Sequence, residues 1–231
     1  MHRSRLCPWP AAACVPALQQ GKRVKMNCPP SCAGSSGGRG FTGQLVRGRL
    51  SDKRYEHTLN VRKMAVKLAK QYGVDEDKAA LAALLHDSAK EISKDEMRAI
   101  LEAHPELAEG GEERPTPVWH AICAAILART EWGVTDEAVL SAIACHTAGK
   151  PGMTQLDKIL YLADMTSKER DWPGVNKLRR LERKDLDLAM LAALKRANDF
   201  VLSEGKPLDP MSKAAYDEIR AEVDARAAKA G

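Results

Sequence analysis

The sequence has 231 residues, of which 44% are hydrophobic and only 4% aromatic, and its formal net charge at pH 7 is +5. The charge is unevenly divided, because residues 1–50 contain eight basic residues and no acidic one, whereas the rest contains 28 basic and 31 acidic residues. A fold that binds nucleic acid needs basic residues clustered on the fold itself, so we expect no nucleic-acid partner. No run approaches the roughly 20 apolar residues that span a bilayer, so we expect no membrane association either.

Residues 1–50 are rich in Pro, Gly, Ser, Cys and Arg and show no helical or strand period, which predicts a disordered extension. The apolar stretch Ala11–Leu18 is short and is interrupted by Pro16, so it makes a poor secretory signal. The spacing of the four cysteines in this segment matches no zinc-binding pattern. We therefore expect a cytoplasmic protein whose folded domain covers residues 51–231.

The first predicted helix begins at about residue 51, where the Pro-, Gly- and Ser-rich composition ends. Ser51 or Asp52 can cap a helix that runs to about Tyr72, and Gly73 ends it. Its apolar face is expected to include Leu59, Ala65, Val66 and Leu68.

The second predicted helix starts at Asp75. Its segment Ala79–Leu85 is apolar nearly all round, as is typical of a helix in the middle of a bundle. His86 and Asp87 follow at its C-terminal end.

Ser93 and Glu96 form a capping box for a short helix through Ala103, and residues 104–115 are expected to be a loop. The next helix begins at Thr116-Pro117, with proline in its first position.

Thr135 is expected to cap a further helix, which Gly149 ends, and another helix runs from about Thr154 to Asp164. Two long helices follow, near 185–204 and 211–229. No strand is predicted, so the domain is expected to be all-α, with Cys123 and Cys145 in its core.

Four of the six histidines lie within or at the end of a predicted apolar helix: His57, His86, His120 and His146. A single histidine in such a place is more often a satisfied core residue than a ligand. Four of them, one per helix, are harder to explain in that way, because a buried histidine without a partner is costly. Convergence on a metal would satisfy several at once, although four separate structural histidines remain an alternative.

The pair His86-Asp87 is the strongest local signal for a metal. A histidine and the following aspartate at a helix end can both reach one ion. Imidazole and carboxylate ligands suit iron, manganese or zinc, and the absence of thiolates disfavours a structural zinc site.

In chain order, the motifs resemble the YqeK branch of the HD-domain superfamily. The resemblance covers about residues 50 to 220. It rests on Arg54–His57, Leu84–Lys90, His120, His146–Gly149, Met153–Asp164 and Arg170.

The resemblance implies an HD-domain helical bundle with symmetrical bis(5'-nucleosyl)-tetraphosphatase activity. The substrate would be a dinucleoside polyphosphate, diadenosine tetraphosphate, and the product ADP. The cofactor would be iron, with manganese or another divalent metal as the alternative. The implied metal ligands are His57, His86, Asp87 and Asp164.

Further roles follow from the resemblance alone. The catalytic residues would be His120, His146, Lys90 and Arg170. The nucleotide would contact these four together with His57 and Thr147. The histidine pair would touch the substrate phosphates or hold a second metal ion. The chain departs from the family between Asp164 and Arg170, where relatives usually have a Glu-Pro pair.

Two alternatives stay open. The domain could be an HD phosphohydrolase that acts on another nucleotide, or a non-catalytic HD module that binds nucleotide. Residues 1–50 are too short for the nicotinate-nucleotide adenylyltransferase domain that is joined to some YqeK-type domains. A homodimer is one option for the oligomeric state.

Overall fold

A computed structural model of the chain describes Gln44 and residues 46–230. Most of the extension predicted over residues 1–50, including its cysteines, therefore lies outside the described residues. Of the part that is described, Val46 is fully buried and Leu50 is 7% exposed, and both belong to the hydrophobic core of the helical domain.

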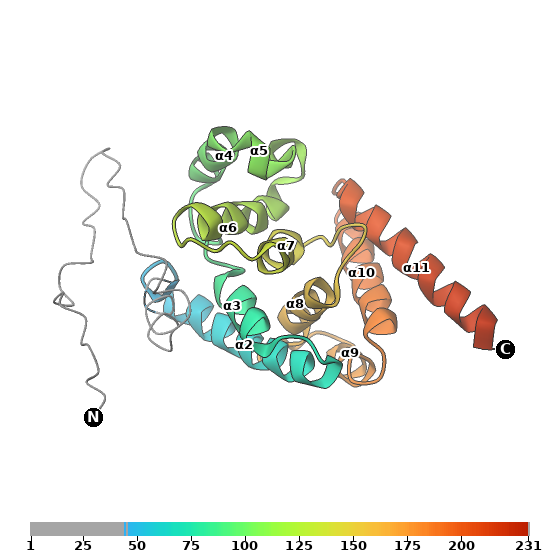
Figure 1. Cartoon of the computed structure of the whole chain (residues 1–231). Coiled ribbons are helices and arrows are strands. Elements are labelled where there is room, and N and C mark those ends of the chain that lie inside the picture. Colours follow the sequence, from blue (N-terminus) through green and yellow to red (C-terminus); the bar gives the residue numbers. More distant parts are fainter. Residues whose placement is uncertain (1–43, 45, 231) are drawn as a thin grey trace, which may run out of the picture. The chain divides into compact units, whose positions relative to one another are not determined.

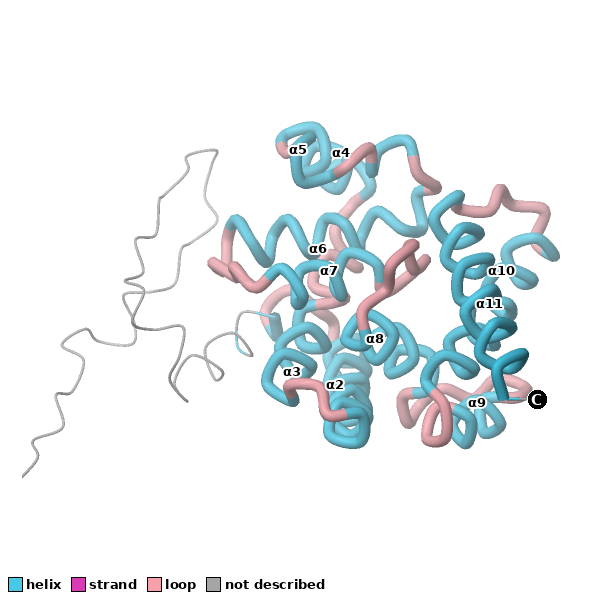
Figure 2. The backbone as a smooth tube through the Cα atoms, turned by 45° about the vertical axis from the view of Figure 1, so that its right-hand side comes forward, coloured by secondary structure: helices cyan, strands magenta, loops and turns pink. Residues whose placement is uncertain are grey.

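The described residues form helices joined by turns and contain no strand (Figures 1 and 2). The all-α prediction is confirmed for this part of the chain. The α-helices are α2 (Asp52–Tyr72), α3 (Glu76–Leu85), α4 (Lys94–Ala103), α5 (Pro105–Ala108), α6 (Trp119–Thr130), α7 (Glu137–Cys145), α8 (Gln155–Thr166), α9 (Val175–Leu181), α10 (Leu186–Ser203) and α11 (Pro210–Ala230). Two 3-10 turns, η3 (Gly111–Glu113) and η4 (Thr116–Val118), precede α6.

Most predicted helix ends are confirmed by their caps. The Ser51 hydroxyl accepts a hydrogen bond from the Arg54 amide at the start of α2, and Gly73 ends that helix with φ 68°. A residue with a Cβ would be strained in this left-handed conformation. Ser93 and Glu96 form the predicted capping box, and Thr154 forms another with Asp157 at the start of α8.

Some expectations were wrong. The predicted loop over residues 104–115 contains α5 and η3. The cap of α7 is Asp136, not Thr135, because the Asp136 carboxylate accepts hydrogen bonds from the first free amides of the helix, at Ala138 and Val139. Helix α9 was not predicted; it is short, and no side-chain cap marks its start at Gly174.

The centre of the domain is α8, which packs against α2, α3, α7, α9 and α10. Every residue from Leu156 to Ala163 is buried. Helix α3, expected in the middle, is more peripheral, since Ala80 and Leu81 are partly exposed. On α2, Leu59 and Val66 are also partly exposed, and the buried face consists of His57, Thr58, Val61, Ala65, Leu68 and Ala69.

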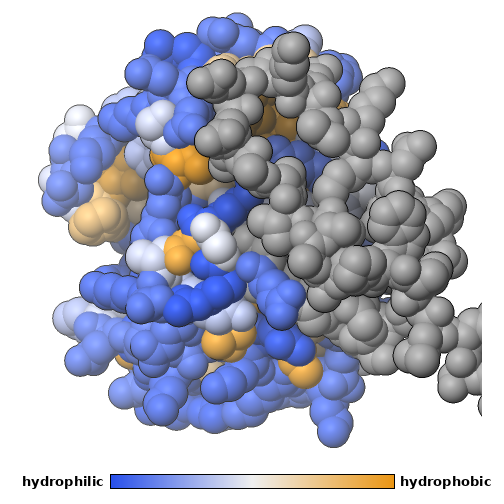
Figure 3. All heavy atoms as spheres, turned by 90° about the vertical axis from the view of Figure 1, so that its left-hand side faces the viewer, coloured by the Kyte–Doolittle hydropathy of each residue, from blue (hydrophilic) through white to orange (hydrophobic). Residues whose placement is uncertain are grey.

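The surface of the described domain is mostly hydrophilic on the face in Figure 3, with separate hydrophobic spots. Large exposed apolar side chains are confined to Leu188, Phe200, Leu202 and Met211 among the described residues. None of the described helices combines the length and the hydropathy that a membrane crossing requires. Cys123 and Cys145 are free and buried, as expected.

Candidate metal centre

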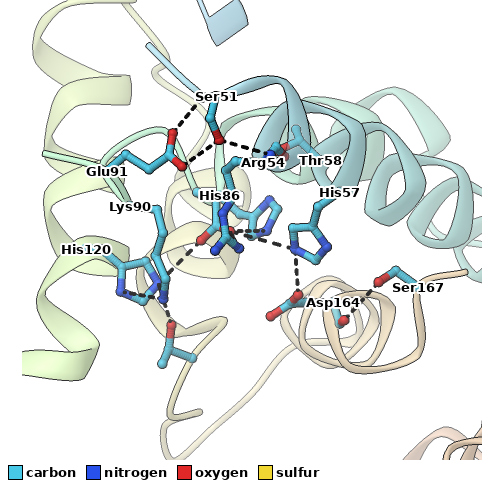
Figure 4. Close-up of polar contacts among 12 residues, drawn as sticks. Ser51, Arg54, His57, Thr58, His86, Lys90, Glu91, His120, Asp164 and Ser167 are labelled. Atoms are coloured by element: carbon cyan, nitrogen blue, oxygen red, sulfur yellow. Dashed lines mark hydrogen bonds and ion pairs between the residues drawn. The ribbon is translucent and has the colours of Figure 1, made fainter. Parts of the chain in front are cut away.

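Five helices bring the predicted ligands together. His57 lies in the second turn of α2, His86 and Asp87 follow α3, and Asp164 lies in the last turn of α8. His120 and His146 are contributed by α6 and by the end of α7. The four histidines and Asp87 are buried, with exposed fractions of 7% or less. The arrangement around His57, His86, His120 and Asp164 is shown in Figure 4.

Two of the histidines are oriented by the helices that they end. His86 and His146 are the C-caps of α3 and α7, where the last carbonyl oxygens lack partners within the helix. Nδ1 of His86 lies 2.7 Å from the Ala83 carbonyl oxygen, and Nδ1 of His146 lies 2.7 Å from that of Ile143. A carbonyl oxygen can only accept, so each Nδ1 carries the proton and donates it. The opposite nitrogen, Nε2, is left with a lone pair.

Asp87 lies between the histidines. Its Oδ2 is 3.5 Å from Nε2 of His86 and 3.7 Å from Nε2 of His57. Its Oδ1 is 3.5 Å from Nε2 of His120 and 3.7 Å from Nε2 of His146. One carboxylate therefore faces all four imidazoles, two from each oxygen.

Asp164 closes the cluster on the α8 side. Its Oδ1 lies 3.0 Å from Nε2 of His57 and 2.5 Å from Nη2 of Arg170. Arg170 also donates from Nε to the Asp164 carbonyl oxygen at 2.9 Å. This guanidinium is thus held against the end of α8.

The donor atoms are spaced as a cation would require. Ligand atoms lie within 4.8 Å of one another in three sets: His57 with His86 and Asp87; His86 with His146 and Asp164; and Asp87 with His120 and His146. Nε2 of His57 and Nε2 of His86 are buried and make no hydrogen bond. Buried polar atoms are seldom left without a partner, and nitrogen lone pairs beside two carboxylates are suitable donors to a metal. The cluster therefore fits a divalent metal ion.

The protonation states agree with this arrangement. Burial lowers the pKa of His86 to about 4, and burial together with His146 and Lys90 lowers the pKa of His120 to about 2. Burial opposes ionisation of Asp87, but its histidine neighbours hold the pKa of that carboxyl well below its ordinary value. Burial opposes the charged form of His57, but its contacts with Asp164 and Glu169 raise the pKa of this histidine above its ordinary value. At neutral pH His86 and His120 are thus neutral imidazoles and Asp87 is an ionised carboxylate, the forms that bind metals.

The other predicted site residues lie beside the cluster. Lys90 Nζ is 3.1 Å from Nε2 of His120, and burial lowers the pKa of this lysine. The Thr147 hydroxyl is 3.1 Å from Nε2 of His120 and 3.2 Å from Nε2 of His146. Arg170, which is expected to bind phosphate, lies against Asp164. Their roles toward a nucleotide stay predictions.

Sequence reasoning assigned no role to three residues that the structure places here. Arg54 Nη1 donates to Asp87 Oδ2 at 2.9 Å, and its position one turn before His57 on α2 was the available signal. Glu91 accepts hydrogen bonds from the amide and hydroxyl of Ser51, at 2.6 and 2.7 Å, and so ties the start of α2 to the segment after Asp87 (Figure 4). Glu169 contacts Nδ1 of His57.

Comparison with known proteins supplies independent information. A family model described as the HD domain matches residues 54–169. The chain is 40% identical over 184 residues to the symmetrical bis(5'-nucleosyl)-tetraphosphatase of Halalkalibacterium halodurans, an alignment that covers 78% of this chain and 96% of the relative. The protein of the same name from Bacillus subtilis is 38% identical, over 74% of this chain and 92% of the relative.

A solved structure shares the fold. It is a predicted HD superfamily hydrolase involved in NAD metabolism from Clostridium acetobutylicum. It superposes with a TM-score of 0.76 at 32% sequence identity, covering 80% of this chain and 97% of that chain.

Proposed function

This chain belongs to the HD domain family, with the symmetrical bis(5'-nucleosyl)-tetraphosphatases among its relatives, and on that premise we propose that it hydrolyses diadenosine tetraphosphate to two molecules of ADP. The observation that carries the proposal is the pair of buried histidine nitrogens without hydrogen-bond partners, on His57 and His86, beside two carboxylates.

In the proposed enzyme, a divalent cation is held by His57, His86, Asp87 and Asp164. We propose iron, with manganese as the alternative. When bound, such an ion acidifies water for attack and polarises a phosphoryl oxygen. Hydrolysis adds the elements of water across one anhydride bond: the water oxygen bonds to phosphorus, the bridging bond breaks, and the leaving phosphate takes a proton.

The basic residues of the site offset the charge of the phosphate chain. Lys90 is half-buried beside His120, and its side chain lies where an anion would relieve the cost of partly burying an ammonium group. Arg170 presents a planar guanidinium, which suits two phosphate oxygens. Arg170 donates to Asp164, a proposed metal ligand, from Nε and Nη2. Its remaining N–H groups would donate to the phosphate oxygens.

His120 and His146 are the candidates for proton transfer to the leaving ADP, with Thr147 beside both. In the protein alone His120 is neutral, because burial and Lys90 disfavour its charged form. A polyphosphate brings negative charge next to the ring, which favours protonation. The alternative role for this pair is to hold a second cation with Asp87, since their donor atoms lie close enough together.

Product analysis tests the proposal. Purified protein with Mn²⁺ or Fe²⁺ is incubated with diadenosine tetraphosphate, and the products are separated by ion-exchange chromatography. Two molecules of ADP per substrate are expected, with no product after chelation. ATP plus AMP would reject symmetrical cleavage. Binding without turnover would favour a nucleotide-binding module, and preferred hydrolysis of a deoxynucleotide or a cyclic nucleotide would favour another HD phosphohydrolase.

A further inference from the structure

The residue Glu169 lies in the turn after α8 and reaches back to α2. Its Oε1 contacts Nδ1 of His57, a residue 112 positions earlier. The Ser167 hydroxyl donates to the same oxygen at 2.7 Å. The side chain of Glu169 is 37% exposed, whereas that of His57 is 8% exposed. A partly exposed carboxylate thus contacts the Nδ1 edge of a buried imidazole.

His57 needs such a partner because of its place in a helix. His86 and His146 end their helices, and each donates Nδ1–H to the carbonyl three residues earlier. His57 is the sixth residue of a 21-residue helix, where backbone carbonyl oxygens already accept hydrogen bonds from amides of the next turn. No free carbonyl of its own helix is available, so an acceptor must come from elsewhere in the chain.

We infer that Glu169 is a positioning residue, which fixes the tautomer and ring plane of His57 so that Nε2 faces the metal; this inference rests on the proposed function. An imidazole that binds a metal through one nitrogen carries a single N–H on the other, and the carboxylate on Nδ1 retains it there. Nε2 then keeps its lone pair toward Asp87 and Asp164. Carboxylates that accept from the outer nitrogen of a metal-binding histidine both orient the ring and increase its basicity.

The turn that carries Glu169 is held from outside by Arg179 on α9. Arg179 donates from Nε to the Thr166 carbonyl at 3.0 Å, and from Nη2 to those of Ser167 and Arg170 at 2.8 and 2.9 Å. These bonds hold the backbone on both sides of Glu169. The exposed turn is therefore fixed well enough to orient a buried ring.

Metal affinity tests the inference separately from turnover. The Kd for Mn²⁺ is measured on metal-depleted full-length protein by electron paramagnetic resonance of free Mn²⁺. Loss of an outer partner costs about 10–100-fold in metal affinity, so the Kd of Glu169→Ala should rise by about that factor. Glu169→Gln keeps an acceptor oxygen without the charge, and its Kd should fall between those of the wild type and Glu169→Ala.

The matched control is Lys168→Ala in the same turn. Lys168 is exposed, and only its backbone carbonyl takes part in a contact within the described structure, so its Kd for Mn²⁺ should equal that of the wild type. Circular dichroism verifies that each variant is folded. A role of Glu169 in folding alone would lower the melting temperature of the metal-depleted protein and leave the Kd unchanged, which overturns the inference.

The outcomes separate the two proposals. If the wild type binds Mn²⁺ and cleaves diadenosine tetraphosphate but Glu169→Ala binds Mn²⁺ equally well, the inference fails and the proposed function stands. If the wild type binds no divalent metal, the proposed function fails and the inference fails with it.

Discussion

Replacing Asp87 by asparagine should separate metal binding from folding. The carboxylate lies within 3.7 Å of Nε2 of each of the four site histidines and accepts a hydrogen bond from Arg54. Asparagine has the same shape and retains one acceptor oxygen for Arg54, but it carries no charge. Asp87→Asn should therefore fold while losing one of the two anionic donors of the cluster.

The size of the effect follows from the position of Asp87. Loss of an outer partner costs about 10–100-fold in metal affinity, so loss of a direct anionic donor should cost at least about 100-fold. Metal supplied at about 100 times the wild-type Kd stabilises the wild type by about 2.7 kcal/mol. The same concentration would equal the Kd of the variant and stabilise it by only about 0.4 kcal/mol.

Thermal unfolding with and without Mn²⁺ measures this difference. For a domain of this size, about 1 kcal/mol shifts Tm by roughly 2–4 °C. The wild type should therefore gain about 5–10 °C on metal addition, and Asp87→Asn about 1 °C. Activity should fall in parallel. If Asp87→Asn gains as many degrees as the wild type, Asp87 is not a metal ligand and the assignment of the cluster is wrong.

Three further predictions concern residues around the centre. Lys90→Ala should lower kcat/KM for diadenosine tetraphosphate by about 10²–10³-fold, since it removes the half-buried charge that is proposed to face the phosphates, and an unchanged kcat/KM would contradict that role. Arg179→Ala should lower the free energy of unfolding by about 2–3 kcal/mol in urea titrations, because carbonyl oxygens of the turn lose a charged donor. Burial raises the pKa of Glu182 to about 7 despite Thr166 and the neighbouring cations, so the folded protein holds a proton that the unfolded chain releases above about pH 4.5. Stability should therefore fall by up to about 3 kcal/mol as pH rises from 5 to 8, and Glu182→Gln should remove that slope; an equal slope in wild type and variant would refute this.

The sequence predicted those parts of the fold that depend on local chemistry. Ser51, Asp75, Ser93 and Thr154 cap helices through their own side chains, so the helix starts follow from residue type and spacing. Helix α9 follows Gly174 without a side-chain cap. Its Arg179 donates to carbonyl oxygens of the turn between α8 and α9, contacts that depend on how the turn folds back and that no residue spacing shows.

The candidate site also contains residues that the sequence predicts and residues whose contacts depend on the packing of the helices. The histidines and aspartates stand in motifs of recognisable order, and the structure brings them together. Arg54 and Glu169 act through contacts across 33 and 112 residues, which depend on how α2, α3 and α8 pack. Periodicity assigns a side chain to a face of its helix but not to a partner on another helix. The spacing of Arg54 and His57 therefore indicates that both side chains lie on the same side of α2, but the sequence identifies neither Asp87 as the partner of Arg54 nor Glu169 as the partner of His57.

The contact between His57 and Glu169 also bears on the order in which the histidines of the centre become oriented during folding. His86 and His146 obtain their orientation from carbonyls three residues away, as soon as α3 and α7 form. His57 obtains its own only when a segment 112 residues later has docked, and long-range contacts of this kind form late because the loop between them must first be closed. A ribosome-bound chain that ends before Glu169 would thus have His86 and His146 oriented by their own helices, but it would lack the contact that orients His57.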